Sequence, residues 1–322
     1  MATAEHIKAL IKAFLTDNDK ERFRVISLQV AAYEASKGHK SLALEIKNIV
    51  DNAKLKESNV IQFTPDLSDL ILLTKPKAYL SNLVISDELM TKLNRILKEY
   101  LNKGKLEKHG LSNRRKLLMV GKPGTGKTMT ASVIASELNL PLYTVQMDRL
   151  INKYMGETGA KLRQIFEVIK KQKGVFLFDE FDAIGAERNT ENEVGEMRRV
   201  LNSFLQFIEN DHSDSLILAA TNNLDILDKA LFRRFDDVLS YDLPDNNQIL
   251  VLLKDKFADF NITFKFEKIV NHALGLSHSD ITLACLDTIK EYILEDKKRI
   301  SKKSLCKILA DRKMVYGDNN GI

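Results

Sequence analysis

The chain has 322 residues, of which 44% are hydrophobic and 29% charged, a composition typical of a globular protein long enough for two or three domains. It has no run of about 18 apolar residues, so we expect no membrane span, and its first ten residues, MATAEHIKAL, lack the apolar stretch of a secretory leader. The net charge of +5 is confined to residues 295–313. There it favours a solvated helix face over a nucleic-acid surface, because no aromatic residues alternate with the basic ones.

Cysteine and histidine usage indicates neither a disulfide framework nor a metal framework. Cys285 and Cys306 have no paired spacing, and the six histidines form no ligand cluster. We therefore expect no structural metal and a cytoplasmic, reducing setting.

Residues 1–55 predict a small helical bundle that serves as an N-terminal adaptor domain. Three stretches with apolar residues at helical spacing are separated by the breaks DND at 17–19 and KGH at 37–39. This pattern is too general to identify a ligand. Residues 56–82 hold two of the five prolines and are interpreted as a linker with a short docking segment.

The pattern changes at about residue 83. A long amphipathic helix is followed by short apolar runs that alternate with helical stretches, at 116–120, 141–145, 175–179, 216–221 and 237–243. Buried strands separated by helices predict a doubly wound α/β domain with a five-stranded parallel sheet over residues 83–243. Residues 244–322 predict an all-helical lid domain.

A phosphate-binding motif directly follows the first of these strands. Residues 121–128 read GKPGTGKT and fit G-x-x-x-x-G-K-[ST], in which glycines let backbone N–H groups curl round phosphate oxygens. This predicts a P-loop NTPase that binds ATP and Mg²⁺, with Lys127 on the β- and γ-phosphates and Thr128 on the metal. The expected nucleotide-binding residues are Gly110, Pro123, Gly124, Thr125, Gly126, Lys127, Thr128 and Met129.

Acidic and amide side chains end the later strands. The run VFLFDEFD places Asp179 and Glu180 after a buried strand, where they predict a magnesium ligand and a group that orients the attacking water. The alternative is a pair of surface or capping charges. Asn222, at the end of LILAATNN, is a candidate to share that water, although asparagine at a strand end is more often a turn residue.

Two adjacent arginines, Arg233 and Arg234, stand in LDKALFRRFDD. Such pairs are usually surface charge. The alternative is an arginine finger that reaches the γ-phosphate held by a neighbouring subunit, an effect of roughly 10³–10⁵ in rate where it operates.

Together GKPGTGKT, FLFDEFDAIG, AATNN and LDKALFRRFD stand in the order and spacing of AAA+ ATPases, and the chain resembles that family over about residues 83–315. Within it the chain is similar to the AAA clade and, with its small helical N-domain, to stand-alone bacterial AAA proteins. The lid segment GLSHSDI resembles that clade's G-x-S-G-A-D-I, with His278 and Ser279 in place of Gly-Ala. The resemblance implies that Asn222 is a sensor. It also implies that Arg233 and Arg234 are fingers acting in trans, and hence a ring, most often of six subunits.

The segment NKYMGE also takes on meaning through the resemblance. In this family the loop after the second strand carries an aromatic–apolar–glycine triplet that faces a central pore and grips unfolded polypeptide. Tyr154, Met155 and Gly156 match that triplet, with Lys153 beside it. A tyrosine ring and a pliable methionine contact varied side chains without demanding a sequence. The alternative is that both apolar side chains pack into the core behind a surface loop.

The favoured function is an ATP-hydrolysing ring motor that remodels or threads a protein substrate. One alternative is a nucleotide-dependent switch or scaffold that recruits partners through its N-terminal bundle, and Asp179, Glu180 and the twin arginines argue against it. The other is an AAA+ protein that acts on nucleic acid, which the pore triplet disfavours. Analogy with stand-alone bacterial members suggests a separately encoded protease partner, such as a subtilisin-like protease.

Overall fold

The protein is described here from a computed structural model. Contacts divide it into two compact units, residues 1–63 and 64–322. The structure describes residues 8, 12, 20–39, 41–48, 65–153, 157–184, 191–223, 232–262, 264–296 and 299–317.

The first unit contains two of the three predicted helices. Helix α2 spans Lys20–Ser36, residues 41–48 are also helical, and Gly38 turns the chain between them with a φ of +92°. Glycine adopts this left-handed conformation without steric cost. The predicted first helix lies outside the described residues apart from Lys8 and Lys12.

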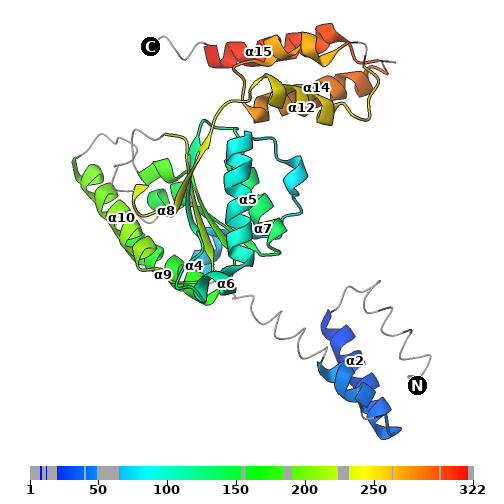
Figure 1. The fold of residues 1–322 in the computed structure, drawn as a ribbon, viewed down its shortest axis with the longest axis vertical. Coiled ribbons are helices and arrows are strands. Elements are labelled where there is room, and N and C mark those ends of the chain that lie inside the picture. The colour runs from blue at the N-terminus through cyan, green and yellow to red at the C-terminus, as the bar shows by residue number, and fades with distance from the viewer. Residues whose placement is uncertain are drawn as a thin grey trace. The chain divides into compact units, whose positions relative to one another are not determined.

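The second unit is built on a six-stranded sheet in the order β1-β3-β4-β5-β2-β6. Figure 1 shows helices on both sides of this sheet. The five predicted strands are confirmed and run parallel to one another. They are β2 (Lys116–Gly121), β3 (Leu142–Gln146), β4 (Val175–Asp179), β5 (Leu216–Thr221) and β6 (Asp237–Tyr241).

The sixth strand is a correction to the predicted linker. Strand β1 spans Ile71–Thr74 and pairs antiparallel with β3 at one edge of the sheet. Helix α4 (Pro65–Ser68) precedes it and a 3₁₀ turn at Leu80–Asn82 follows. Residues 64–82 therefore belong to the same compact unit as the sheet.

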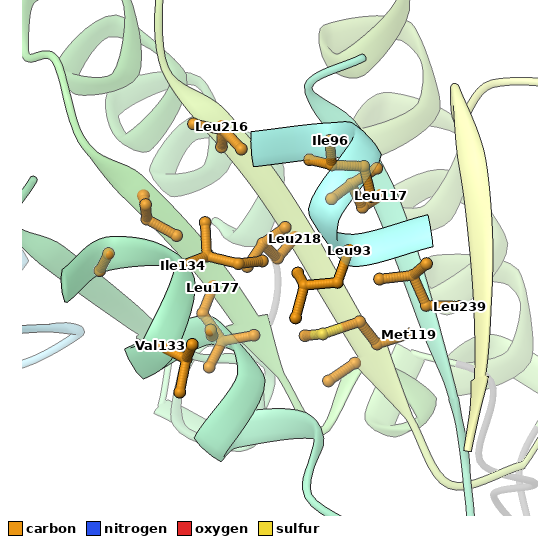
Figure 2. Close-up of a cluster of buried hydrophobic side chains, with 14 of the residues drawn as sticks. Leu93, Ile96, Leu117, Met119, Val133, Ile134, Leu177, Leu216, Leu218 and Leu239 are labelled. Atoms are coloured by element: carbon orange, nitrogen blue, oxygen red, sulfur yellow. The ribbon is translucent and has the colours of Figure 1, made fainter. Parts of the chain in front are cut away.

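One face of the sheet is covered by α5 (Asp87–Leu101) and α7 (Lys127–Glu137). Figure 2 shows leucines from four strands meeting Leu93 and Ile96 of α5 and Ile134 of α7. These three helix residues are fully buried. Because α7 begins at the phosphate loop, this packing fixes the direction in which its first turn points. The short helix α6 (Lys103–Glu107) leads into β2.

The other face of the sheet is packed with aromatic side chains. Phe178 of β4 contacts Phe166 of α9 (Thr158–Lys171) and Phe204 of α10 (Glu191–Glu209), with ring centroids 5.8 and 5.0 Å apart. The neighbouring Leu177 belongs to the opposite core. Side chains of β4 thus alternate between two buried faces, as the predicted doubly wound sheet requires. Helix α8 (Met147–Lys153) and a 3₁₀ turn at Phe181–Ile184 complete this layer.

Beyond β6 the described chain is helical, as predicted. Its elements are α12 (Asn246–Lys256), a 3₁₀ turn (Phe266–Lys268), α13 (Val270–Ala273), α14 (His278–Leu294) and α15 (Lys302–Gly317). They share a core of their own that includes Leu253, Ile281 and Leu305. Of the helices in the described ranges, none is both long and apolar enough to cross a membrane.

Candidate nucleotide-binding site

The phosphate loop connects the carboxyl end of β2 to the first turn of α7. Gly126 precedes the helix with a φ of +106°, and no side chain within the described residues caps the helix start. The first backbone N–H groups of a helix have no partner within the helix, and the helix dipole places partial positive charge there. The loop therefore ends in an anion-binding geometry.

Lys127 is buried, and its ammonium group donates three hydrogen bonds. The acceptors are the backbone carbonyls of Gly121 and Lys122, at 2.6 and 2.9 Å, and Asn222 Oδ1, at 2.8 Å. Burial lowers the pKa of Lys127, and the nearby carboxylates of Asp179 and Asp182 oppose that shift. The loop thus carries a lysine whose three donors are all engaged and would have to be exchanged for phosphate oxygens.

Two side-chain oxygens that could act as metal ligands lie near this lysine, one on Thr128 and one on Asp179. The Thr128 hydroxyl donates to Asp179 Oδ2 at 3.2 Å, which joins the start of α7 to the end of β4. Magnesium prefers such oxygens and is usually held by one or two protein groups plus phosphate oxygens. In the described ranges no three His, Cys, Asp or Glu side chains gather into a metal site. The hydroxyl of Thr128 and the carboxylate of Asp179 suit Mg²⁺ that takes its remaining ligands from a nucleotide and water.

Glu180 follows Asp179 in an uncommon backbone conformation. Its φ is +53°, in the left-handed region that costs energy for residues other than glycine, and its N–H donates to Asp179 Oδ1 at 3.0 Å. The side chain is exposed. Partial desolvation of its carboxyl group is the main cause that raises the pKa of Glu180, followed by the negative charges of Asp148, Asp179 and Asp182. A carboxylate with a raised pKa accepts a proton more readily.

Asn222 is brought to the same place from the next strand. Strand β5 lies between β4 and β2, so the ends of the three strands are neighbours. Besides accepting from Lys127, Asn222 donates its backbone N–H to Asp182 Oδ1 at 3.3 Å. The structure thus gathers Lys127, Thr128, Asp179, Glu180 and Asn222 at the carboxyl ends of the central strands, as the motif spacing predicted.

The lid also contacts the phosphate loop. The Ser279 N–H donates to the Gly124 carbonyl at 3.0 Å. A Cβ atom added to Gly124 would lie 2.5 Å from Ser277 Oγ, and the glycine has a φ of +74°. The start of α14 is fixed by a capping box between Ser277 and Asp280. Movement of the lid would therefore act directly on the phosphate loop through these contacts.

Three predicted residues are not brought to this place. Gly110 lies in the turn before the amino end of β2, its N–H bonded to Glu107 O at 3.0 Å, whereas the phosphate loop follows the carboxyl end. A strand of this length spans roughly 17–20 Å, so the structure separates Gly110 from the site. Arg233 and Arg234 also lie at the amino-terminal ends of the parallel strands, far from the phosphate loop. They precede β6, which runs parallel to β2.

A hydrogen bond confirms the placement of the arginines. Asp236, two residues after Arg234, accepts at 2.9 Å from the N–H of Lys116, the first residue of β2. Both arginines are exposed, and Arg234 pairs with Glu209 at the end of α10. An exposed ion pair of this kind is worth about 0–1 kcal/mol, so it is easily exchanged for a stronger partner.

Comparison with known proteins identifies the family. The family model described as "ATPase family associated with various cellular activities (AAA)" matches residues 117–243. The AAA family ATPase y4kL of Sinorhizobium fredii is 34% identical over 320 residues, covering 97% of this chain and 96% of that protein. The chain belongs to the AAA family of ATPases. It is thus an enzyme that binds and hydrolyses ATP.

This AAA ATPase is also similar, over part of its length, to archaeal proteins. A putative 26S proteasome regulatory subunit homolog of Methanothermobacter thermautotrophicus is 31% identical, covering 62% of this chain and 55% of its own length. A proteasome-activating nucleotidase of Saccharolobus islandicus is 31% identical over 265 residues, covering 77% of this chain and 67% of its own length. The chain thus spans little more than half of the first of these two proteins and two thirds of the second.

The remaining predicted residues of the AAA ATPase differ in exposure. Pro123 and Met129 are exposed beside the phosphate loop, and Thr125 is buried. Lys153 is the last residue of α8, and its side chain lies outside the described part of the structure. Tyr154, Met155 and Gly156 lie outside the described residues.

Sequence reasoning missed several contributors to the site. Asp182 stands within the motif FLFDEFDAIG, and its charge could have been noticed there. Asp148, by contrast, acts on Glu180 from α8, which is distant in sequence. The contacts of Ser277 and Ser279 with Gly124 depend on how the lid packs, which the resemblance alone did not specify.

We expect that Gly121→Ala will destabilise the AAA ATPase by about 1–3 kcal/mol, the usual cost of overpacking. A Cβ atom at Gly121 would lie 2.2 Å from the Tyr241 carbonyl oxygen of β6, so the two strands would have to separate. Denaturant unfolding measures the change, and ATP binding should weaken with it. Gly104→Ala is the matched control, since nothing lies within 4 Å of its added Cβ atom. Equal stability of the two variants would contradict the close approach.

Proposed function

We propose that this ATPase assembles into a ring, of six subunits by family resemblance, and uses ATP hydrolysis to pull a protein substrate through a central pore. The placement of Arg233 and Arg234 carries the proposal. They lie at the edge of the sheet opposite the phosphate loop of their own chain, so they cannot contact a nucleotide bound there. A role in catalysis requires that they reach the site of a neighbouring copy, and a closed ring supplies every site with such a neighbour.

Within one site the proposed roles follow from the contacts. Lys127 exchanges its three internal acceptors for β- and γ-phosphate oxygens, and the first turn of α7 donates backbone N–H groups to the same phosphates. Thr128 and Asp179 would hold Mg²⁺. When bound, that ion neutralises the charge that builds up on the phosphate oxygens.

Glu180 is proposed to orient and polarise the water that attacks the γ-phosphorus. Partial desolvation and the neighbouring carboxylates raise its pKa, and its backbone is held in a strained conformation. Asn222 loses its Lys127 contact when the lysine turns to phosphate. Its side-chain amide then becomes available to position the same water. Hydrolysis thus depends on positioning and electrostatics rather than on a covalent intermediate.

The names of the archaeal relatives support a protein substrate. They are called proteasome-activating nucleotidase and putative 26S proteasome regulatory subunit homolog. We extend the proposal to a separately encoded protease as partner. The relatives' names favour one of the proteasome type over the subtilisin-like protease suggested by sequence analogy.

The pore contact is tested by Tyr154→Ala. We expect this variant to bind and hydrolyse ATP within about twofold of wild type but to lose ATP-dependent unfolding of a tagged fluorescent protein, because the alanine cannot grip side chains. Tyr154→Phe keeps the ring and should retain activity. Tyr79→Ala, at a tyrosine 61% exposed in the segment before α5, is the control. Normal unfolding by Tyr154→Ala would refute the pore contact.

A further inference from the structure

An ion-pair cluster in the lid joins α14 to α15, which pack against each other (Figure 1). Arg312 of α15 donates through Nη2 to Asp287 Oδ2 at 2.7 Å. Its Nη1 lies 3.9 Å from Asp280 Oδ1, which is close enough for an ion pair but too far for a hydrogen bond. One arginine of α15 thus faces two carboxylates of α14.

Asp280 is the more buried of these two carboxylates. Its side chain is 10% exposed, compared with 38% for Asp287. Its Oδ2 accepts hydrogen bonds from the hydroxyl and the backbone N–H of Ser277, at 2.5 and 3.3 Å. Burying a carboxylate is costly unless a cation or hydrogen bonds compensate its charge. Arg312 supplies a cation beside the oxygen that Ser277 does not contact.

Ser277 connects this cluster to the phosphate loop. A Cβ atom at Gly124 would lie 2.5 Å from Ser277 Oγ, so the serine and the loop are in close contact. The path from Arg312 to the loop therefore has only two links, Asp280 and Ser277. Without the arginine, the carboxylate would gain by turning toward water. That movement would loosen the capping box that places the start of α14 against Gly124.

We propose that Arg312 is a positioning residue for nucleotide binding, which holds the start of α14 against the phosphate loop by compensating the charge of Asp280. The inference rests on the nucleotide site described above and adds α15 to the elements that shape it. Asp287 matters less, because it is more exposed and also accepts from Lys290 at 3.1 Å. It therefore keeps a cation when Arg312 is lost.

The test measures ADP binding to the full chain by isothermal titration, together with KM and kcat for ATP. Arg312→Met keeps the length of the side chain and removes its charge. We expect it to weaken ADP binding and raise KM by roughly tenfold. The kcat should stay within about twofold, because the groups that act on the phosphates are untouched. Lys290→Met is the matched control. It removes the other cation from Asp287 but none from Asp280, and should bind ADP as wild type does.

A double variant separates positioning from a merely structural tie between α14 and α15. In Arg312→Met/Asp280→Asn the buried charge is gone while the amide oxygen can still accept from Ser277, so most of the lost ADP affinity should return. Wild-type affinity in Arg312→Met, or a loss that the second substitution does not restore, would overturn the inference. A wild-type chain that binds no ADP would refute the nucleotide site itself, and the inference with it.

Discussion

The double variant Arg233→Ala/Arg234→Ala is expected to hydrolyse ATP roughly 10³–10⁵-fold more slowly than wild type, the range found where an arginine finger is lost. ATP affinity should change little, because both residues lie a full strand length from the phosphate loop of their own chain. Steady-state phosphate release measures the rate, and fluorescent-nucleotide titration measures the affinity. The folded chain should be no less stable, since only an exposed ion pair with Glu209 is lost.

The control for this pair is Lys170→Ala/Lys171→Ala. It removes two adjacent exposed cations from the end of α9, and we expect wild-type rates. Single variants separate the two arginines, because Arg234 must leave Glu209 whereas Arg233 is exposed. A double variant with a normal rate would mean that the arginines are surface charge.

Glu180→Gln is expected to bind ATP as wild type does but to hydrolyse it roughly 10²–10⁴-fold more slowly, the usual contribution of a positioned proton acceptor. The amide keeps the size of the side chain and removes the proton acceptor. Because Asp179, Thr128 and Lys127 are untouched, phosphate and magnesium binding should survive. Single-turnover hydrolysis measured with excess enzyme separates chemistry from binding and release.

Glu88→Gln, at an exposed glutamate of α5, is the control for this substitution and should leave the rate unchanged. A glutamine variant that loses ATP affinity as strongly as rate would place Glu180 in binding rather than in water activation. A variant with a wild-type rate would remove it from the reaction.

Most of the sheet domain was predictable because its signals are local. Five apolar runs such as VFLFD are each bounded by turn residues, and strands buried on both faces need continuous hydrophobicity. Strand β1 has no such signal. It is four residues long, lies at the sheet edge with Leu72 56% exposed, and stands between Pro65 and Pro76. Its pairing with β3, some 70 residues away, is a long-range contact that no local sequence pattern predicts.

The residues of the candidate site also divide into those that local motifs predict and those that they do not. Lys127 and Thr128 were predictable because their phosphate motif follows β2, and Asp179 and Glu180 because they stand at the end of β4. Parallel strands bring their carboxyl ends together. Gly110 precedes a strand, and its prediction as a nucleotide ligand does not agree with its place at the opposite edge. His278 was visible only as a departure from a motif. Its burial near Val84 and Asp245 depends on how the lid packs, which sequence spacing does not specify.

The central claim, that arginines from one subunit complete the site of the next, is tested most directly by mixing two inactive variants. Lys127→Ala chains lack phosphate binding but keep their arginines. Arg233→Ala/Arg234→Ala chains keep an intact phosphate loop. Each alone should be nearly inactive.

When the two variants are assembled together, some interfaces combine an intact loop with intact arginines from the neighbour, and ATP hydrolysis should reappear. The rate should depend on the mixing ratio, with a maximum between the two pure variants. A mixture that is never faster than the sum of its separate components would contradict catalysis in trans, and with it the proposed ring.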